Sequence, residues 1–434
     1  MRSLTNAPLK IAIAGLGTVG AGTVRLLREQ ASLIEARAGR PVVVTAVSAR
    51  DRSRDRGIDV EGLPWYEDAE AMANDADVDV VVELIGGSDG IAKAVCETAL
   101  ARGRHVVTAN KALLAHHGHA LAKLAEDKGL TLAYEAAVAG GIPIIKALRE
   151  GLAANRIQQL YGILNGTCNY ILTTMRETGR EFAEVLAEAQ ALGYAEADPA
   201  FDIEGTDAAH KLSILASLAF GCPVNFAAMH IEGITNISAL DIRFAEELGY
   251  RIKLLGVARR TEKGIEQRVH PTMVPVGSPI ANVEGVFNAV VAEGDFVGRS
   301  VYEGRGAGAG PTASAVVSDL IDIAAGRRAP TFGVPASALE TLPIVPMEQH
   351  RGNYYIRLMV VDQLGVFAEI AGALRDEDVS MEAILQRGRA PGETVPVVLT
   401  VHDTREEALM RAVERINAIA AVVEPARIIR IESF

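Results

Sequence analysis

Short apolar runs alternate with longer amphipathic stretches along the first 135 residues of the chain. These runs are rich in Val, Ile and Ala and lie at 10–14, 42–48, 78–84, 105–108 and 131–134. Strands that alternate with helices are typical of βαβ units, whose strands pair in parallel. We therefore predict an α/β fold with a doubly wound parallel sheet in this part of the chain.

From residue 136 to 304 the alternation is replaced by helical stretches of unequal length mixed with strands. We expect helices at 182–192, 206–220 and 238–248, and strands at 156–164, 251–259 and 267–276. This pattern predicts an α+β domain inserted into the first domain. Residues 304–326 read as a Gly-rich turn and an apolar helix, which we expect to pack back on the first domain.

Four prolines between residues 329 and 351 indicate a semi-rigid linker, because proline interrupts helices. The chain beyond it predicts a ferredoxin-like βαββαβ order. The expected elements lie at 354–361, 366–375, 380–387, 394–402, 405–418 and 426–431. The predicted domains are 1–135 with 305–330, the insertion 136–304, the linker 331–350 and the C-terminal domain 351–434.

The charge balance makes nucleic acid and anionic membranes unlikely partners. The 434 residues carry 43 Lys and Arg against 55 Asp and Glu, a formal net charge of −12. The longest uncharged stretch, 212–229, is interrupted by glycine and proline, and the apolar run near the N-terminus is too short for a secretory signal. The three cysteines lack a CxxC spacing. We therefore expect a soluble, cytoplasmic protein with small buried thiols.

A G-x-G-x-x-G segment joins the first expected strand to the first expected helix. In this context the glycines permit a tight turn and close approach of the backbone to a pyrophosphate at the helix N-terminus. We predict a Rossmann-type NAD(P) site. Its predicted contacts in this segment are Gly15, Gly17, Thr18, Val19 and Gly20.

The choice between NADP and NAD is expected at the end of the second strand, which reads Arg50, Asp51, Arg52. A guanidinium group binds a phosphate through paired hydrogen bonds, so Arg50 favours the 2′-phosphate of NADP. A shift of one residue would instead place the Asp51 carboxylate on the ribose hydroxyls of NAD. NAD therefore remains an alternative.

Six charged residues lie close together between residues 196 and 211: Glu196, Asp198, Asp202, Glu204, Asp207 and Lys211. Asp207 and Lys211 are four residues apart, so they share one helix face and can form an ion pair. A lysine at the start of an apolar helix can be desolvated, which suits a general acid near neutral pH. The other interpretation, a lysine extended beside a solvated acidic loop, stays open on these residues alone.

The pattern A-x3-G-Y-A-x2-D-P-x2-D-I-x-G-x-D-x3-K, from residue 189 to 211, resembles the homoserine dehydrogenase signature at every fixed position. Residues 108–111, 165–170 and 306–314 resemble the same family in the same order. The resemblance covers residues 10–330 nearly continuously. It implies reversible reduction of L-aspartate 4-semialdehyde to L-homoserine, in the biosynthesis of threonine, methionine and isoleucine.

The resemblance also implies roles for individual residues. Lys211 corresponds to the proton donor, Lys111 to a second catalytic lysine that also contacts the cofactor, and Asp207 to a residue that orients Lys211. Glu196 and Asp202, with Lys211, correspond to the substrate-binding residues. Gly308 and Gly310 correspond to cofactor contacts. A monovalent cation, sodium, is implied at Glu135, Val138, Gly140 and Ile142, mainly through backbone carbonyls.

The segment Asp362 to Val366 resembles the DxxGV loop of ACT domains. Gly365 at a helix N-terminus suits the carboxylate of a free amino acid, so Asp362 and Gly365 are predicted to bind a regulatory ligand. L-Threonine is the expected effector, and ACT domains commonly pair across chains, so we expect a homodimer or homotetramer. His116, His117 and His119 lack a suitably spaced carboxylate or thiol, and we expect a polar helix face there.

Two alternatives are weighed against this function. Another amino-acid or sugar dehydrogenase of similar architecture disagrees with the complete pattern of residues 189–211. A catalytically silent amino-acid sensor would have no need of an acid, so the five intact residues Lys111, Glu196, Asp202, Asp207 and Lys211 disagree with it.

Overall fold

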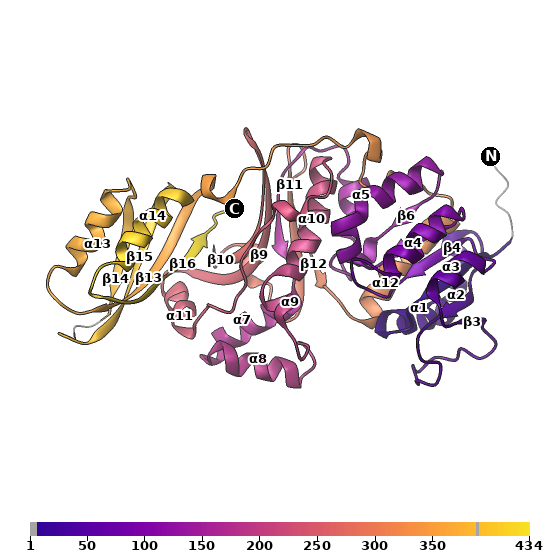
Figure 1. The fold of residues 1–434 in the computed structure, drawn as a ribbon, viewed down its shortest axis with the longest axis horizontal. Helices are drawn as coiled ribbons and strands as arrows, with labels where there is room; N and C mark the ends of the chain where they lie inside the picture. Colours follow the sequence, from indigo (N-terminus) through magenta and orange to yellow (C-terminus); the bar gives the residue numbers. More distant parts are fainter. Residues whose placement is uncertain (1–6, 388–389) are drawn as a thin grey trace.

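The computed structural model describes residues 7–387 and 390–434, so the first six residues of the predicted N-terminal domain lie outside it. Two sheets organise the chain, one of six strands and one of ten. Figure 1 shows the parallel sheet with its helices at one end, the C-terminal domain at the other, and most of the larger sheet between them. No helix within the described residues is both long and apolar enough to span a bilayer.

The six-stranded sheet has the order β3-β2-β1-β4-β5-β6, and all its neighbouring strands are parallel. Its strands are β1 (Leu9–Ala14), β2 (Val42–Ser48), β3 (Trp65–Tyr66), β4 (Val80–Glu83), β5 (His105–Thr108) and β6 (Leu132–Ala133). This order is the doubly wound Rossmann topology, which confirms the predicted fold class. β3 was not predicted, because two residues are too short for an apolar run to be recognised.

Helices cover both faces of this sheet (Figure 1). They are α1 (Thr18–Glu29), α2 (Ala31–Ala38), α3 (Ala69–Asp75), α4 (Ile91–Ala101), α5 (Lys111–Asp127) and α12 (Ala309–Ala324). α12 comes from the Gly-rich segment, and its Val316 and Leu320 share one core with Ile11 and Ile13 of β1. Gly22 permits the close contact of α1 with α12, since a Cβ there would lie 2.7 Å from the Ala309 carbonyl oxygen.

The inserted segment supplies six strands of the larger sheet. They are β7 (Ile157–Ile163), β8 (His230–Ile231), β9 (Tyr250–Thr261), β10 (Gly264–Pro275), β11 (Phe287–Gly294) and β12 (Gly298–Arg305). Its main helices are α7 (Gly166–Thr178), α8 (Phe182–Ala191), α9 (Ala200–Ile203), α10 (Thr206–Phe220) and α11 (Ala239–Glu247), and short α6 (Ile144–Lys146) precedes them. The β11–β12 hairpin was not among the expected strands.

The C-terminal segment folds as β13 (Arg351–Val361), α13 (Val366–Arg375), β14 (Met381–Gln386), β15 (Thr394–Arg405), α14 (Glu406–Asn417) and β16 (Val422–Ile431). The strand order β16-β13-β15-β14 is that of a ferredoxin-like unit, and its helices share one core with the sheet. β16 also pairs in parallel with β10, so this unit continues the sheet of the inserted segment. The chain end therefore lies near the middle of the molecule (Figure 1).

A buried ion pair also joins the C-terminal unit to the inserted segment. Arg357 of β13 donates from Nε to Asp241 Oδ1 at 2.6 Å, and Tyr355 donates its hydroxyl to the same oxygen at 3.2 Å. Asp241 also accepts the Ser238 hydroxyl and amide in the capping box that begins α11. One fully buried carboxylate thus fixes both a helix start and a domain contact.

Replacing Asp241 by Asn should lower the free energy of unfolding by about 3–5 kcal/mol, because the Arg357 guanidinium would be left buried without a counter-charge. Asp403→Asn is the matched control, since Asp403 pairs with Arg351 in an exposed position and should contribute below about 1 kcal/mol. Urea unfolding of both variants measures the difference. Equal losses would contradict this role of Asp241.

Candidate active site

The structure brings together two lysines and a carboxylate that the sequence had singled out. Lys211 Nζ donates to Asp207 Oδ2 at 2.7 Å and to the Leu164 carbonyl at 2.8 Å. Lys111 Nζ lies 3.1 Å from the other carboxylate oxygen of Asp207. Asp207 and Lys211 lie one turn apart on α10, whereas Lys111 begins α5 beside the parallel sheet. The carboxylate therefore bridges the two parts of the fold.

Helix caps place these side chains. Asn110 follows β5 and accepts the Leu113 amide at 3.0 Å, so α5 begins with Lys111 at the carboxyl end of the parallel sheet. Gly205, at a φ of 88°, turns the chain into α10 two residues before Asp207. In doubly wound folds ligands bind at this carboxyl edge.

The Asp207 carboxyl is held in its ionised form. Burial alone would raise its pKa, but the ammonium groups of Lys211 and Lys111 and the amide of Asn165 together hold the pKa well below the usual range. The Lys111 side chain is 34% exposed, whereas that of Lys211 is 10% exposed, so Lys111 is the lysine more open to solvent.

Asp202 of α9 lies beside this cluster. Its carboxylate accepts from Asn165 Nδ2 at 2.8 Å and from the Thr167 hydroxyl at 3.1 Å. Burial, followed by the nearby negative charge of Asp207, raises the pKa of Asp202. The structure therefore places this predicted substrate-binding carboxylate at the Lys–Asp–Lys cluster.

Glu196 is not drawn into the same network. It lies on the exposed loop between α8 and α9, where its backbone carbonyl accepts from Gln190 Nε2 at 3.0 Å. Within the described residues no hydrogen bond or ion pair joins its carboxylate to the cluster.

Asn165 is a site residue to which the sequence analysis gave no role. Its amide nitrogen donates to both Asp202 and Asp207, at 2.8 and 2.9 Å, while its oxygen accepts the Cys168 amide and caps α7. One side chain thus fixes the spacing of two carboxylates. Its position before Gly166 and Thr167 was visible as part of a family-like stretch, but its two partners come from distant parts of the chain.

A cavity of about 990 Å³ lies at the carboxyl ends of β1, β2 and β4, and its wall includes Gly15, Gly17 and Arg50. Gly15 has a φ of 98°, and a Cβ there would lie 2.6 Å from the Leu84 carbonyl oxygen. A Cβ at Gly20 would lie 2.1 Å from the Gly15 carbonyl oxygen. These contacts require glycine, as the motif predicted, and Thr18 and Val19 form the first turn of α1 behind them.

Arg50 and Asp51 have different surroundings at the rim of this cavity. Arg50 is exposed, whereas the Asp51 carboxylate accepts the Ser53 hydroxyl at 2.6 Å and its amide at 2.9 Å. These hydrogen bonds lower the pKa of Asp51 and hold its carboxylate within its own turn. Arg56 is also engaged, since its Nε donates to the Leu16 carbonyl at 3.0 Å.

Glu83, at the end of β4, orders one wall of the cavity and was not predicted. Its fully buried carboxylate accepts the Ile85 amide at 2.7 Å and the Thr108 hydroxyl at 2.6 Å. Burial raises its pKa. Asn110 follows β5, and its Nδ2 donates to the Gly87 carbonyl at 2.7 Å. Hydrogen bonds therefore connect the segment after β4 to the start of α5, where Lys111 lies.

The residues proposed to hold a cation lie where α12 meets the chain that leaves β6. Glu135 and Gly140 line a cavity of about 360 Å³, while Val138 and Ile142 are buried and do not contribute to its wall. The Glu135 carboxylate accepts the amides of Ile145 and Lys146, at 3.0 and 2.9 Å. Burial and then the charge of Asp319 raise its pKa to about 7. Two of the four residues therefore line one cavity, to which Glu135 brings a buried carboxylate.

Among the remaining predicted residues, the glycines lie at the starts of α12 and α13. Gly308, at a φ of 129°, precedes α12, and Gly310 lies in its first turn, near the N-terminus of α1. Gly365, at a φ of 93°, precedes α13. The Asp362 carboxylate accepts the Ala390 amide at 2.7 Å, so it anchors a neighbouring loop of its own domain. His117 Nε2 lies 2.9 Å from Asp89 Oδ1.

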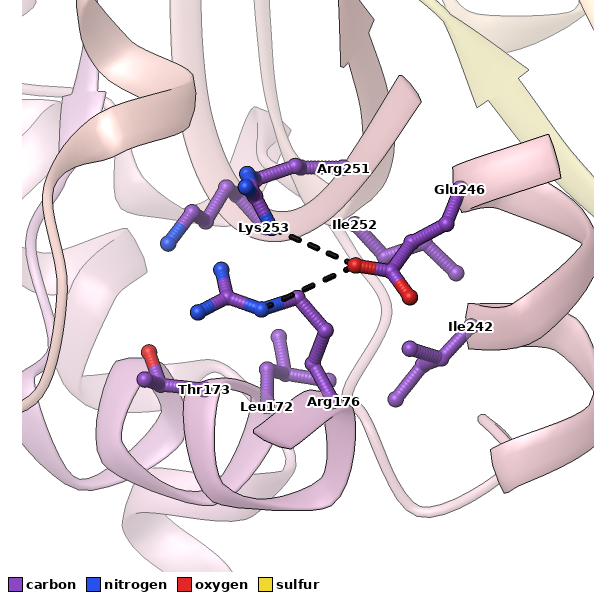
Figure 2. A pocket seen from close by; sticks show the side chains of 8 residues that line it. All are labelled: Leu172, Thr173, Arg176, Ile242, Glu246, Arg251, Ile252 and Lys253. Atoms are coloured by element: carbon purple, nitrogen blue, oxygen red, sulfur yellow. Dashed lines mark hydrogen bonds and ion pairs between the residues drawn. The ribbon is translucent and has the colours of Figure 1, made fainter. Parts of the chain in front are cut away.

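A smaller enclosed cavity of about 10 Å³ lies between α7, α11 and β9 (Figure 2). Arg176, Arg251 and Lys253 point toward it, and Glu246 contacts both arginines (Figure 2). Lys253 is almost fully buried, and its Nζ donates to the Val283 carbonyl at 2.6 Å. Burial lowers the pKa of Lys253 to about 8. This space suits one water molecule and is too small for an amino acid or a nucleotide.

Comparison with known proteins identifies the family of each part of the chain. A family model described as homoserine dehydrogenase matches residues 143–321, and one described as homoserine dehydrogenase, NAD binding domain, matches residues 15–135. An ACT domain model matches residues 354–418.

Three relatives show how far the similarity extends. A homoserine dehydrogenase of Neisseria gonorrhoeae is 49% identical and covers 98% of this chain and 99% of its own. The crystal structure of a homoserine dehydrogenase from Thiobacillus denitrificans is 48% identical, with a TM-score of 0.93 over 98% of this chain and 99% of its own. A hyperthermophilic archaeal homoserine dehydrogenase in complex with NADPH is 25% identical, with a TM-score of 0.63 over 77% of this chain and 100% of its own. The chain therefore belongs to the homoserine dehydrogenase family of NAD(P)-dependent oxidoreductases that act on CH–OH groups.

Proposed function

We propose that this chain catalyses the reversible reduction of L-aspartate 4-semialdehyde to L-homoserine, a step toward threonine, methionine and isoleucine. The observation that carries the proposal is the Lys111–Asp207–Lys211 cluster beside Asp202, which Asn110 connects to the segment after β4 at the edge of the dinucleotide cavity. The cluster combines two lysine ammonium groups, which can bind the aldehyde oxygen, with a carboxylate that can bind the substrate ammonium group. Those are the two polar ends that an amino-acid aldehyde presents.

The lysines supply the acid for the reaction. When bound, the nicotinamide supplies a hydride to the aldehyde carbon, and negative charge then develops on the aldehyde oxygen. Lys211 has three N–H donors, of which Asp207 and Leu164 take two, so one remains to donate its proton to that oxygen. Lys111 adds a second positive charge at the same place. In the oxidation direction Lys211 accepts the proton from the hydroxyl.

Carboxylates orient the substrate and the lysines. Asp202 binds the substrate ammonium, and Glu196, on the exposed loop between α8 and α9, is proposed to join it there when substrate is bound. Asp207 holds both lysine head groups but has no role in accepting the substrate proton, because its pKa lies well below the usual range. Asn165 keeps the two aspartates at a fixed spacing.

The cofactor in this proposal is NADP, bound by Gly15, Gly17, Thr18, Val19 and Gly20 at the start of α1 and by Gly308 and Gly310 at the start of α12. The support for NADP over NAD is twofold. Arg50 is exposed on the cavity wall, whereas the Asp51 carboxylate is taken up by Ser53. The archaeal relative was solved in complex with NADPH.

The same proposal includes the domain boundaries predicted from the sequence. They are 1–135 with 305–330, the insertion 136–304, the linker 331–350 and the C-terminal domain 351–434. The packing of α12 on α1 supports the discontinuous first domain. We further propose a cytoplasmic homodimer or homotetramer, since ACT domains commonly pair across chains.

In the presence of L-homoserine, the purified enzyme should reduce NADP, and it should reduce NADP faster than it reduces NAD. Lys211→Ala should lower kcat by about 10²- to 10⁴-fold, because the proton donor is lost. Lys123→Ala is the matched control, since Lys123 pairs with Asp127 on the exposed face of α5. Absorbance of the reduced cofactor measures all rates. No turnover with either cofactor would contradict the function, and full activity of Lys211→Ala would contradict only the role of Lys211.

Sodium is proposed to bind at Glu135, Val138, Gly140 and Ile142 and to hold the junction of α12 with the inserted segment. Sodium chloride should then raise the unfolding midpoint more than choline chloride at equal ionic strength. The gain should approach about 2.7 kcal/mol at a hundred times Kd. Glu135→Gln should remove the difference between the salts. An equal response of wild type to both salts would contradict the site.

L-Threonine is proposed to bind the C-terminal domain near Asp362 and Gly365 and to inhibit the enzyme. Calorimetric titration of the full chain should show saturable threonine binding, and added threonine should lower the rate. Asp362→Ala should weaken both effects, because the loop anchored on Ala390 would lose its hydrogen bond. Serine serves as the control ligand. A titration without heat, together with an unchanged rate, would contradict threonine feedback.

A further inference from the structure

One arginine near the chain end contacts both the C-terminal domain and the inserted segment. Arg430 of β16 donates from Nη1 and Nη2 to the two carboxylate oxygens of Glu232, at 2.9 and 2.8 Å. Its Nε donates to Glu406 Oε2 at 3.1 Å, and Glu406 also accepts the Tyr354 hydroxyl at 2.8 Å. Arg430 is 5% exposed. A paired, planar contact of this kind fixes both distance and orientation.

Glu232 is held firmly on its own side of this contact. His230 Nε2 lies 2.7 Å from Glu232 Oε1, and the Glu232 amide donates to the Val269 carbonyl at 2.8 Å. Burial alone would raise the pKa of Glu232, but His230 and Arg430 hold it well below the usual range. The carboxylate therefore stays ionised, and the ion pair with Arg430 is complete.

The backbone beyond Glu232 packs directly on α9. The Ile234 amide donates to the Ile203 carbonyl at 2.9 Å. Gly233 lies so close that a Cβ on it would be 2.2 Å from the same carbonyl oxygen. Ile203 is the neighbour of Asp202 in α9. Glu232 is therefore connected to Asp202 through the backbone of Gly233 and Ile234, one hydrogen bond and the backbone of Ile203.

The same segment supports the start of α10. A Cβ at Gly205, which turns the chain into α10, would lie 3.3 Å from the Glu232 carbonyl oxygen and 3.2 Å from a methyl group of Val269. Backbone from Glu232 to Ile234 thus borders both α9 and the turn that leads to Asp207.

We propose that Glu232 is a positioning residue for the substrate, held by Arg430 from the C-terminal domain, and that this Glu232–Arg430 clamp sets the place of Asp202. Asp202 is a substrate residue only under the function proposed above. The clamp does not touch the dinucleotide cavity, so it acts on the amino-acid end of the reaction alone. Neither residue contacts a reacting atom.

Glu232→Gln keeps the size of the side chain but removes its charge, and the half-exposed position should let the variant fold. The KM for L-homoserine should rise by about 2- to 30-fold, while the KM for NADP and the unfolding midpoint stay near wild type. Arg430→Gln should change the same constant in the same direction. Glu232→Asp, which keeps the charge, should show the smaller rise.

Arg351→Gln is the matched control, because it breaks an exposed arginine–carboxylate pair of the same domain, with Asp403. Its kinetic constants should remain at wild-type values. An unchanged homoserine KM in Glu232→Gln would overturn the clamp, as would an equal rise of both KM values. Absence of wild-type turnover would instead overturn the proposed function, so the two failures are distinguishable.

Discussion

An ionised carboxylate shared by two ammonium groups is the interaction on which the site depends. Asp207 is buried, and a carboxylate in that position is tolerated only because Lys111 and Lys211 neutralise it. The two lysines in turn would repel one another without it. Since Lys111 comes from the parallel-sheet part and Lys211 from α10, the same charge balance holds α5 and α10 at one distance. The geometry of the cluster and the packing of α5 on α10 therefore depend on the same ion pairs.

The polar residues around this cluster follow from it. Asn165 can satisfy both aspartates because Asp207 is fixed, and Asp202 takes its orientation from Asn165 and Thr167. Behind them the Glu232 backbone supports α9. Under the proposed function, the substrate end of the site is built from the inserted segment and supported by the C-terminal domain, while the cofactor end is built on the parallel sheet.

Features that depend on residues close together in the sequence could be predicted from sequence patterns. The strand–helix alternation predicted the parallel sheet, the glycine spacing predicted the turn before α1, and the spacing of Asp207 and Lys211 predicted an ion pair on one helix face. Contacts between segments far apart in the sequence could not be predicted in this way. Nothing in the sequence around Lys111 shows that it meets Asp207, and the family resemblance predicted only that Lys111 belongs to the site. For the same reason, no role was predicted for Asn165. Backbone carbonyl ligands of a cation cannot be recognised either, because they involve no particular side chain. The pairing of β10 with β16 involves two residue pairs and cannot be recognised from either strand.

The continuous ten-stranded sheet limits how such a chain can be recombined. Arg268 of β10 is 1% exposed, and it is paired with Glu266 from its own strand and with Glu432 from the chain end. A cut at the proline-rich connection would leave that guanidinium half-neutralised in the interior and would expose backbone of β10. The C-terminal domain is therefore not an interchangeable part. A C-terminal domain grafted from another enzyme would have to bring an acid at the position of Glu432 and an arginine at that of Arg430 to complete the same strand edge.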